Sequence, residues 1–297
     1  MGAKLRVIRR RMRSVNSTMK ITRAMELIAA SRIVKAQGRV EASRPYAERL
    51  TAAMEDVARQ SAELSDPLLE ERADPRVTGV LVITSDRGLA GAYNSNVLRR
   101  AEQVMADVRR RGLTALPYVV GKKGVSYFRF RGIEMQETWT GVSEVPPYDA
   151  AVEIGHRLIS DYSARKIDEL QVVYTDFRSA FTLRTTDKRF LPIAPEEVGG
   201  AATSGEPSAS YIFEPEPGAI LGELLPQYLI TKVYSAMLES AASESASRRR
   251  AMKAATDNAD ELIKVLSRIA NQERQAEITT EISEIVGGAE ALKASGE

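Results

Sequence analysis

The sequence predicts an α/β protein in which two long helices, one at each end of the chain, flank a small, mostly parallel sheet and pair with each other as an antiparallel coiled coil. Three observations predict this arrangement. Residues 227–292 contain no proline, and their only glycines are Gly287 and Gly288. Residues 4–44 follow one heptad pattern without proline. Between these arms, short β-branched runs alternate with helical segments, which is typical of a doubly wound sheet.

The C-terminal arm is too long to fold inside a globule. At about 1.5 Å per residue, a helix over 227–292 would extend for roughly 100 Å. Its apolar residues recur at alternating spacings of three and four and form a stripe that needs a partner. After Ile269 the stripe slips by two residues before it resumes. The stripe consists of Met252, Ala255, Ala259, Leu262, Leu266 and Ile269, followed by Ile278, Ile282, Ile285, Ala289 and Leu292.

The N-terminal arm fits a left-handed coiled coil, because a strict three-four heptad is typical of that structure. Only Thr22, Glu26 and Ser43 interrupt the apolar seam. The alternative is an ordinary amphipathic helix on a globular core. We expect Pro45 to bend or restart the helix, which continues to about Glu63. The seam positions are Leu5, Ile8, Met12, Val15, Met19, Thr22, Glu26, Ala29, Ile33, Ala36, Val40, Ser43, Ala47, Leu50, Met54 and Val57.

The middle of the chain begins after a polar connector with two prolines, residues 66–75. Strand and helix patterns then alternate, and two strands separated by only a turn predict an antiparallel hairpin attached to the sheet. A small, polar loop at 199–210 has no assigned role, and we expect a last short strand over 211–214. The predicted elements are strand 77–84, helix 94–111, strand 116–120, helix 122–131, strand 133–137, helix 148–164, strand 169–175 and strand 181–190.

These patterns divide the chain into an N-terminal helix, 1–64, an α/β domain, 76–214, and a C-terminal helix, 215–297. If the arms pair antiparallel from their prolines, about 25 residues of the C-terminal arm, or roughly 37 Å, remain unmatched. This tip carries Ile278, Ile282, Ile285 and Leu292, which have no intramolecular partner in that arrangement. Because an exposed apolar stripe is a liability unless something covers it, the tip is predicted to sit inside a partner protein.

Composition excludes several functions. The chain has no cysteine, which excludes disulfides and thiolate catalysis and favours a reducing compartment. Its single histidine, His156, makes a zinc site improbable, and we expect it to be a satisfied or exposed side chain. No run of about 18 apolar residues and no signal-peptide core is present. The sequence therefore predicts a protein that is soluble or at most peripheral to a membrane.

A nucleotide-binding α/β enzyme with coiled-coil arms is one alternative. The loop SDRGLAGAYN, residues 85–94, follows a strand and opens a helix, the position at which helix N-termini bind phosphate. Its glycines, Gly88 and Gly91, do not have the spacing of a dinucleotide fingerprint or a Walker loop. A second turn, from Gly121 to Gly124, has no serine or threonine for magnesium. We expect a structural turn or a docking loop, and neither a cofactor nor a catalytic or metal site.

A coiled-coil nucleic-acid-binding protein is the other alternative. The net charge of +2 conceals a basic run without acids in the first turns of the chain, which would attract phosphate. The run shares its helix with the heptad seam, and no recognition module or interleaved aromatics accompany it. Contact with an acidic protein surface is the better explanation, so we expect no nucleic acid partner. The run consists of Lys4, Arg6, Arg9, Arg10, Arg11 and Arg13.

Several stretches resemble the γ subunits of F-type ATP synthases, in the right order over nearly the whole chain. They are ITRAMELIAASR (21–32), ASRPYAE (42–48), SDRGLAGAYNSN (85–96), MKAATDNA (252–259) and ERQAEITTEISEIVGGA (273–289). The resemblance implies two long helices in an antiparallel coiled coil and a Rossmann-like α/β domain. It also implies a partner for the tip, the hexameric ring of α and β subunits, which would carry the nucleotide sites.

The resemblance further implies a rotary function. The α/β domain and lower coiled coil would rest on the c-ring and the ε subunit, and rotation of the asymmetric shaft would bias the three β sites in turn. Matched by motif, Met25, Arg274, Gln275 and Thr279 resemble the rotor-to-β coupling positions; otherwise they are ordinary surface or seam residues. Without a cysteine pair, thiol regulation is not expected. No targeting stretch is recognised, which favours the cytoplasmic face of a bacterial plasma membrane.

Overall fold

The computed structural model describes residues 3–60, 66–177, 179, 182–194, 197 and 216–294. The chain divides into two compact units. Unit 1 comprises Met1–Ile28 and Arg249–Glu297, and unit 2 comprises Ala29–Arg248. Each unit therefore contains a part of both long helices, and only unit 2 contains the sheet. The predicted segment bounds, 1–64, 76–214 and 215–297, stay a prediction.

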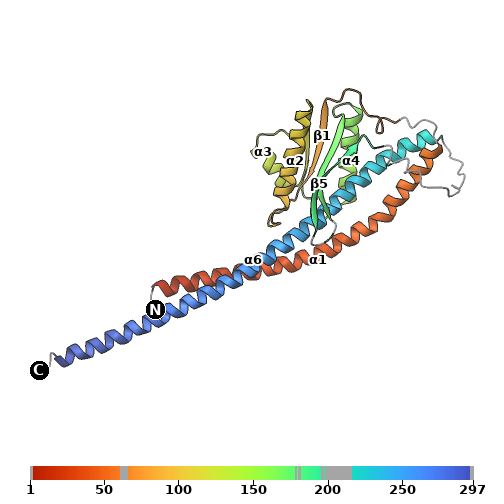
Figure 1. Ribbon diagram of the computed structural model, residues 1–297. Coiled ribbons are helices and arrows are strands. Elements are labelled where there is room, and N and C mark those ends of the chain that lie inside the picture. Colours follow the sequence, from red (N-terminus) through yellow and green to blue (C-terminus); the bar gives the residue numbers. More distant parts are fainter. Residues whose placement is uncertain are drawn as a thin grey trace. The chain divides into compact units, whose positions relative to one another are not determined.

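Two long helices, α1 (Ala3–Gln60) and α6 (Pro217–Ala294), run side by side (Figure 1). Of the two outcomes expected at Pro45, the restart is wrong, since α1 is continuous through it, and the bend stays a prediction. Pro45 is exposed, so water can solvate the carbonyl left without its donor. Helix α6 begins at Pro217, ahead of Pro226 and close to the start of the predicted C-terminal helix, 215–297. Pro217 at its first turn has a backbone angle already suited to a helix.

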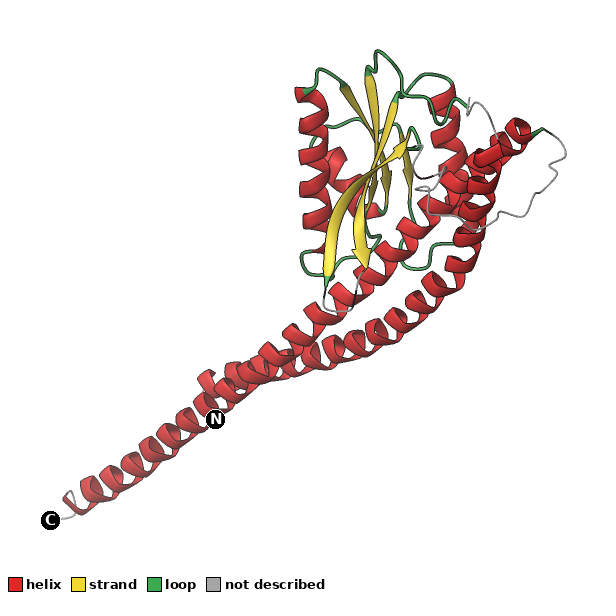
Figure 2. Ribbon diagram, turned by 45° about the vertical axis from the view of Figure 1, so that its right-hand side comes forward, coloured by secondary structure: helices red, strands yellow, loops and turns green. Residues whose placement is uncertain are grey.

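Unit 2 contains a five-stranded sheet in the order β3-β2-β1-β4-β5 (Figure 2). The strands β3, β2, β1 and β4 are parallel, and β5 pairs antiparallel with β4. The predicted mixed fold with an attached hairpin is thus confirmed. The strands are β1 (Val77–Ile83), β2 (Thr114–Val120), β3 (Glu137–Trp139), β4 (Glu169–Phe177) and β5 (Leu183–Leu191).

The predicted helices are confirmed with small shifts at their ends, as α2 (Tyr93–Arg110), α3 (Lys122–Phe130) and α4 (Tyr148–Ser163). The third strand is placed wrongly by the sequence, which predicts 133–137. Ile133 and Met135 pack beside the core of α2 and α3, while ladder pairing starts only near Gln136, whose N–H donates to the Pro117 carbonyl at 2.8 Å. The loop 199–210 and the expected strand 211–214 lie outside the described residues.

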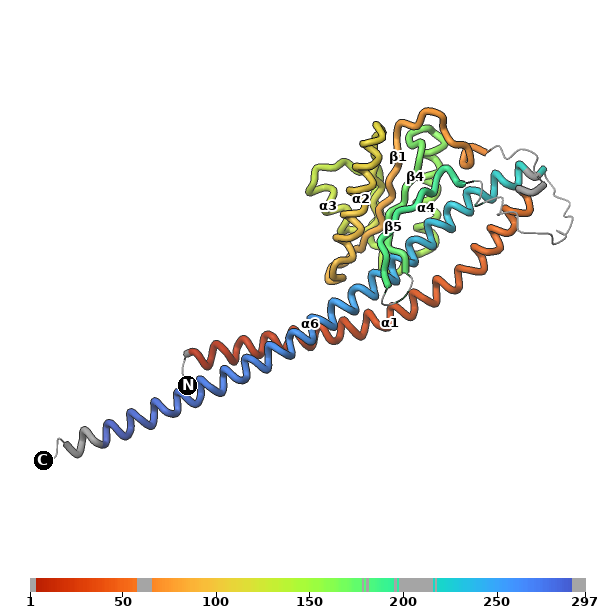
Figure 3. Tube along the Cα trace, viewed as in Figure 1, coloured from red at the N-terminus to blue at the C-terminus, as the bar shows by residue number. Residues whose placement is uncertain are grey.

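The two faces of the sheet bury different helices, because successive strand residues point to opposite sides. Val80 and Val82 of β1 pack with α2 and α3 on one face. Leu81 and Ile83 pack on the other face with α4 and with the parts of α1 and α6 that belong to unit 2. The chain path through these layers can be followed in Figure 3. Both long helices are therefore part of the hydrophobic core of unit 2.

Unit 1 consists of the first part of α1 and the last part of α6. The predicted α1 seam is confirmed there, because Leu5, Ile8, Met12, Val15, Met19, Thr22 and Glu26 are all buried or half-buried. The α6 side is buried at Met252, Thr256, Ala259 and Leu266. The Oγ1 atoms of Thr22 and Thr256 lie 2.8 Å apart and share a hydrogen bond in the middle of the seam. This pair fixes the register of the two helices in unit 1.

The same pair locates the end of the helix pairing. Counting an equal number of residues from Thr22 to Ala3 and from Thr256 onward reaches about Gln275. Helix α6 continues to Ala294, so an overhang of roughly 28 Å extends beyond the described part of α1. The sequence-based value of roughly 37 Å is too long, because it assumed that pairing starts at the two prolines. The overhang of α6 after Gln275 is called the tip below.

Candidate functional site

The loop Ser85–Ala92 between β1 and α2 lies at the N-terminus of α3, where an anion could bind. The donors there already have partners within the chain. The Lys122 N–H donates to Asp86 Oδ1 at 3.0 Å, and the Lys123 N–H donates to the Ser85 carbonyl at 3.0 Å. The Gly124 N–H donates to Thr84 Oγ1 at 2.9 Å. A side-chain carboxylate thus occupies the position that a phosphate would take.

Asp86 has a second set of bonds that fixes this loop to the segment before α4. Its Oδ2 accepts the Ser143 N–H at 3.0 Å, and its own N–H donates to Ser143 Oγ at 2.8 Å. Burial acts to raise the pKa of Asp86, but backbone hydrogen bonds from Gly141, Ser143 and Lys122 outweigh it, and the pKa lies below its ordinary value. Asp86 therefore stays ionised at neutral pH and holds the loop as a fixed carboxylate.

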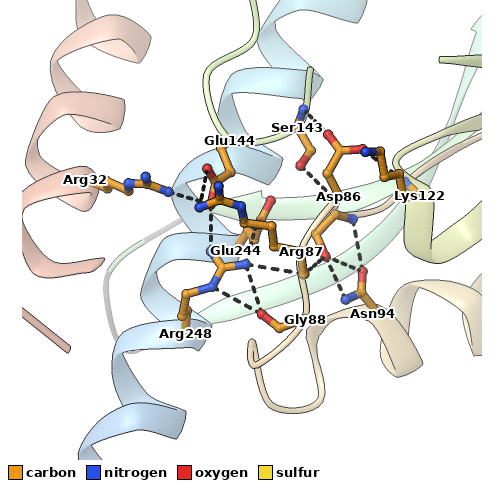
Figure 4. Close-up of polar contacts among 11 residues, drawn as sticks. Arg32, Asp86, Arg87, Gly88, Asn94, Lys122, Ser143, Glu144, Glu244 and Arg248 are labelled. Carbon is orange, nitrogen blue, oxygen red and sulfur yellow. Dashed lines mark hydrogen bonds and ion pairs between the residues drawn. The ribbon is translucent and has the colours of Figure 1, made fainter. Parts of the chain in front are cut away.

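A cluster of charged side chains continues from this loop to α6 (Figure 4). Arg248 is buried, with its side chain only 7% exposed, and donates from Nη2 to Glu244 Oε1 at 2.6 Å. It also donates to the Gly88 carbonyl at 3.2 Å and to the Arg87 carbonyl at 3.4 Å. One guanidinium thus joins α6 to the loop through both a carboxylate and backbone carbonyls.

Glu144, in the segment before α4, completes the cluster. Its carboxylate pairs with Arg32 of α1, with Arg87 of the loop at 3.5 Å and with Arg248 of α6 at 3.8 Å. The side chain of Glu144 is 21% exposed. We call Arg32, Arg87, Glu144, Glu244 and Arg248 the clamp. All five residues belong to unit 2, and they connect four segments that are far apart in the sequence.

Small residues on α6 allow this close approach. Every residue from Ala241 to Arg248 is buried, whereas Arg249 and Arg250 are exposed. Ser243 Oγ donates to the Thr175 carbonyl of β4 at 3.2 Å, so this part of the helix touches the sheet on one side and the loop on another. Burial raises the pKa of Glu244, although Arg248 opposes the effect. The helix is therefore enclosed by unit 2 up to Arg248.

The residues that the sequence predicts as coupling contacts lie elsewhere, in unit 1. Met25 is half-buried on α1, and Arg274, Gln275 and Thr279 are exposed on α6. The α6 residues lie within about one turn of one another, and Thr279 Oγ1 donates to the Gln275 carbonyl at 2.9 Å. Met25 lies opposite about Lys253 in the register set by the threonine pair, so it does not join the other three. Their role stays a prediction.

The tip exposes its apolar side chains. Ile278, Ile282 and Ile285 have exposed fractions of 45%, 56% and 72%, and Val286 adds 51%. The coiled-coil seam instead passes through Ala270, Glu273 and Glu277, which are half-buried. The two-residue slip thus turns the isoleucines away from the seam. Leu292 lies within α6, but its side chain is outside the described residues.

Other candidate sites can be placed as well. His156 is exposed on α4, as expected. Within the described residues, no group of three or more histidine, aspartate or glutamate side chains could hold a metal ion. No helix in that part of the chain has the length and apolar character needed to cross a bilayer. No sequence pattern indicates the clamp, except that Glu244 and Arg248 are one helical turn apart among small residues.

The backbone N–H groups of the α/β unit that could bind a phosphate already have partners within the chain. The two helices that flank this unit continue as a coiled coil with an apolar tip. Together these features define a class of stalk-forming subunits. Comparison with known proteins identifies the family. The ATP synthase family model matches residues 4–292. The chain therefore belongs to the ATP synthase gamma chain family, which confirms the resemblance seen in the sequence.

Similar chains cover the whole length. The ATP synthase gamma chain of Mycolicibacterium smegmatis is 52% identical over 99% of this chain and 100% of that protein. The gamma chain of Acidothermus cellulolyticus is also 52% identical, over 100% of this chain and 99% of that protein. Both are gamma chains of the kind that the sequence motifs indicate, so the resemblance extends through the arms and the α/β domain alike.

Solved structures share the fold. A chain of the Euglena gracilis mitochondrial ATP synthase (OSCP/F1/c-ring) aligns with a TM-score of 0.69 at 17% identity, over 100% of this chain and 97% of that one. A chain of the central stalk and c-ring structure from Tetrahymena thermophila aligns with a TM-score of 0.58 at 24% identity, over 79% and 99%. At these identities the likeness concerns the fold alone.

Proposed function

We propose that this chain is the central rotor shaft of a proton-translocating F-type ATP synthase. In this role it couples rotation of a membrane-embedded c-ring to the conformational cycle of nucleotide sites on a surrounding ring of α and β subunits. The observation that carries the proposal is the tip, a single helix with Ile278, Ile282 and Ile285 exposed beyond the end of the coiled coil. An exposed apolar stripe of this kind marks a surface that another protein covers.

The proposed partners are an α/β hexamer for the tip and an ε subunit and c-ring for unit 2. The membership in the gamma chain family supports them, as do the names of the similar structures, which include F1 and c-ring assemblies. Membrane association would come only through the complex. By analogy with bacterial relatives, the chain would act at the cytoplasmic face of the plasma membrane.

Coupling requires that the shaft present different surfaces to the three β subunits, since a ligand or partner shifts an equilibrium only through different contacts in each state. The proposed contacts are Arg274, Gln275 and Thr279 on α6, all exposed, and Met25 on α1. The exposed isoleucines of the tip, with Leu292, would serve as the bearing. The chain would have no catalytic site of its own, and the occupied donors around Asp86 support this.

The test is a truncation in the assembled complex. A chain ending at Ala276 should retain the fold of unit 2, measured by circular dichroism and thermal unfolding of the free chain. In membrane vesicles containing the complete synthase, ATP-driven proton pumping should fall much more than ATP hydrolysis. A truncated shaft that supports full assembly and full proton pumping would show that the tip is not the bearing.

The control is Ile285→Ala, Ile282→Ala in the full-length chain. It removes the apolar groups of the tip but keeps the helix and its exposed backbone. An intermediate loss of proton pumping would show that the apolar surface of the tip matters. Ser267→Ala, on α6 before the tip, is a neutral comparison. A loss as small as in that variant would show that the truncation acts through helix length alone.

A further inference from the structure

The clamp lies at the place where both long helices leave unit 2. The division between the units falls after Ile28 on α1 and after Arg248 on α6. Arg32 is one turn inside that limit on α1, and Arg248 is the last residue inside it on α6. Burial changes at the same point, since Arg248 is buried and Arg249 is exposed. The clamp therefore marks the root of both arms.

The three arginine partners of Glu144 come from three separate segments. Arg32 lies on α1, Arg87 lies in the loop after β1, and Arg248 lies on α6, and all three guanidinium groups are directed at Glu144 (Figure 4). A carboxylate that lies among several guanidinium groups attracts all of them, and in a partly buried position this attraction is screened less than it would be in water. Glu144 is thus the group that α1 and α6 share at their roots.

The partly buried position of Glu144 makes its ion pairs with the arginines sensitive to loss of the carboxylate charge. Oε1 of Glu144 is buried and lacks a hydrogen bond of good geometry, as does Oε2 of Glu244. Both carboxylates depend on the ion pairs with arginine for compensation, and removal of one charge in such a group leaves the others uncompensated. Two hydrogen bonds between Asp86 and Ser143 fix the backbone next to Glu144.

We propose that Glu144 is a positioning residue for torque, which fixes the roots of α1 and α6 to the α/β sheet so that rotation of unit 2 is passed to the arms without slippage. This inference rests on the proposed rotor function. A shaft that carries torque must be rigidly joined to the part on which torque acts, and the seam of unit 1 alone cannot provide that joint. The apolar core that both helices share with the sheet provides part of that joint, and Glu144 adds a polar connection through Arg32 and Arg248.

The test uses the complete synthase in membrane vesicles and measures both ATP hydrolysis and ATP-driven proton pumping. In Glu144→Ala we expect hydrolysis to be retained and protons pumped per ATP to fall by about threefold. Glu144→Gln keeps the shape without the charge and should give a smaller loss, so it serves if the alanine variant assembles poorly. Glu134→Ala, an exposed acid in the same unit, is the matched control and should change neither activity.

A covalent bridge provides the rescue. Because the chain contains no cysteine, Arg32→Cys with Glu144→Cys can be joined selectively by a bismaleimide of suitable length. The unlinked variant should be uncoupled and the linked one should recover pumping, which a purely structural loss would not do. Normal coupling in Glu144→Ala, or no recovery on linking, would overturn the proposal. If truncation at Ala276 uncouples the complex and Glu144→Ala does not, the rotor function stands and only the role of Glu144 fails.

Discussion

The two units of this chain are stabilised in different ways. Unit 2 buries large side chains on both faces of its sheet, among them Tyr118, Phe128 and Leu158, all fully buried. Unit 1 has a narrow seam in which most side chains are only half-buried and a threonine pair stands at the centre. The difference indicates that unit 2 can hold its structure alone, whereas we propose that the end of unit 1 is covered by a partner.

The largest expected effect on stability lies in the clamp. Arg248→Ala removes a buried guanidinium, leaves Glu244 uncompensated and takes one of three arginine partners from Glu144, which should lower the free energy of unfolding by about 3–5 kcal/mol. Urea unfolding of the free chain, followed by circular dichroism, measures the change. Arg249→Ala, at the next and exposed position, should change it by less than about 0.5 kcal/mol. Equal effects of the two variants would contradict the clamp.

The second effect compares the same type of substitution in the two units. Leu229→Ala on α6 in unit 2 creates a cavity at a fully buried site and should cost about 3 kcal/mol. Ile282→Ala in the tip removes a side chain that is 56% exposed, and the free chain should lose less than about 0.5 kcal/mol. A large loss in the second variant, measured by the same unfolding experiment, would mean that the free tip is already buried.

A third effect depends on pH and belongs to unit 2. Burial raises the pKa of Glu239 to about 7, with Asp176 adding to the effect and Lys188 opposing it. Arg39, Arg44 and Ser235 line the same cavity of 660 Å³. A glutamate in the unfolded chain has a pKa of about 4.3, so the folded chain binds this proton more tightly. The stability that the protonated Glu239 contributes is therefore fully present below about pH 4.3 and is lost as the pH rises through 7.

Glu239→Gln should therefore remove a pH-dependent loss of roughly 2 kcal/mol between pH 5 and pH 7.5. Unfolding free energies of both forms over this range test the prediction. Asp86, Asp161 and Asp168 have pKa values below the ordinary range and titrate at more acidic pH. Burial also raises the pKa of Glu244, but this residue is present in both forms, so the difference between the two pH profiles isolates Glu239. Parallel pH profiles for the two forms would rule out the assignment to Glu239.

The smallest effect concerns the seam of unit 1. Thr22→Val breaks the hydrogen bond to Thr256 and leaves one buried hydroxyl without its cross-helix partner, which should cost about 1 kcal/mol. The double variant with Thr256→Val replaces both hydroxyls with methyl groups and should recover most of that loss. A double-mutant cycle measured by thermal unfolding gives the coupling. Additive losses would show that the pair does not determine the register.

Sequence patterns predicted the two arms and the sheet well because their periods are long and regular. The heptad from Leu5 to Val57 holds at each of its positions, all of which are buried or half-buried. The predicted position of the third strand, 133–137, was wrong because an apolar run indicates burial but does not specify which residues pair in a sheet. Ile133 packs beside helices instead. Pro45 does not restart the helix, because an exposed helical position tolerates the lost hydrogen bond.

The site was harder to predict for physical reasons. Glu144, Arg32 and Arg248 come together only after the sheet and helices have assembled, and no local pattern links positions so far apart in the chain. The phase slip before Ile278 was visible in the sequence, and it does turn the isoleucines away from the seam. The surface that the isoleucines contact depends on other chains. For the same reason, the coupling contacts at Arg274, Gln275 and Thr279 stay a prediction.

The central claim is that the exposed apolar surface of the tip is covered by a partner protein in the assembled complex. Hydrogen exchange of backbone amides in residues 277–289 tests it most directly, compared between the free chain and the chain assembled with α and β subunits. We predict fast exchange in the free chain and slowing by about a hundredfold in the complex, while amides of β1 and β4 exchange slowly in both. Equal exchange of the tip in the two states would contradict the account.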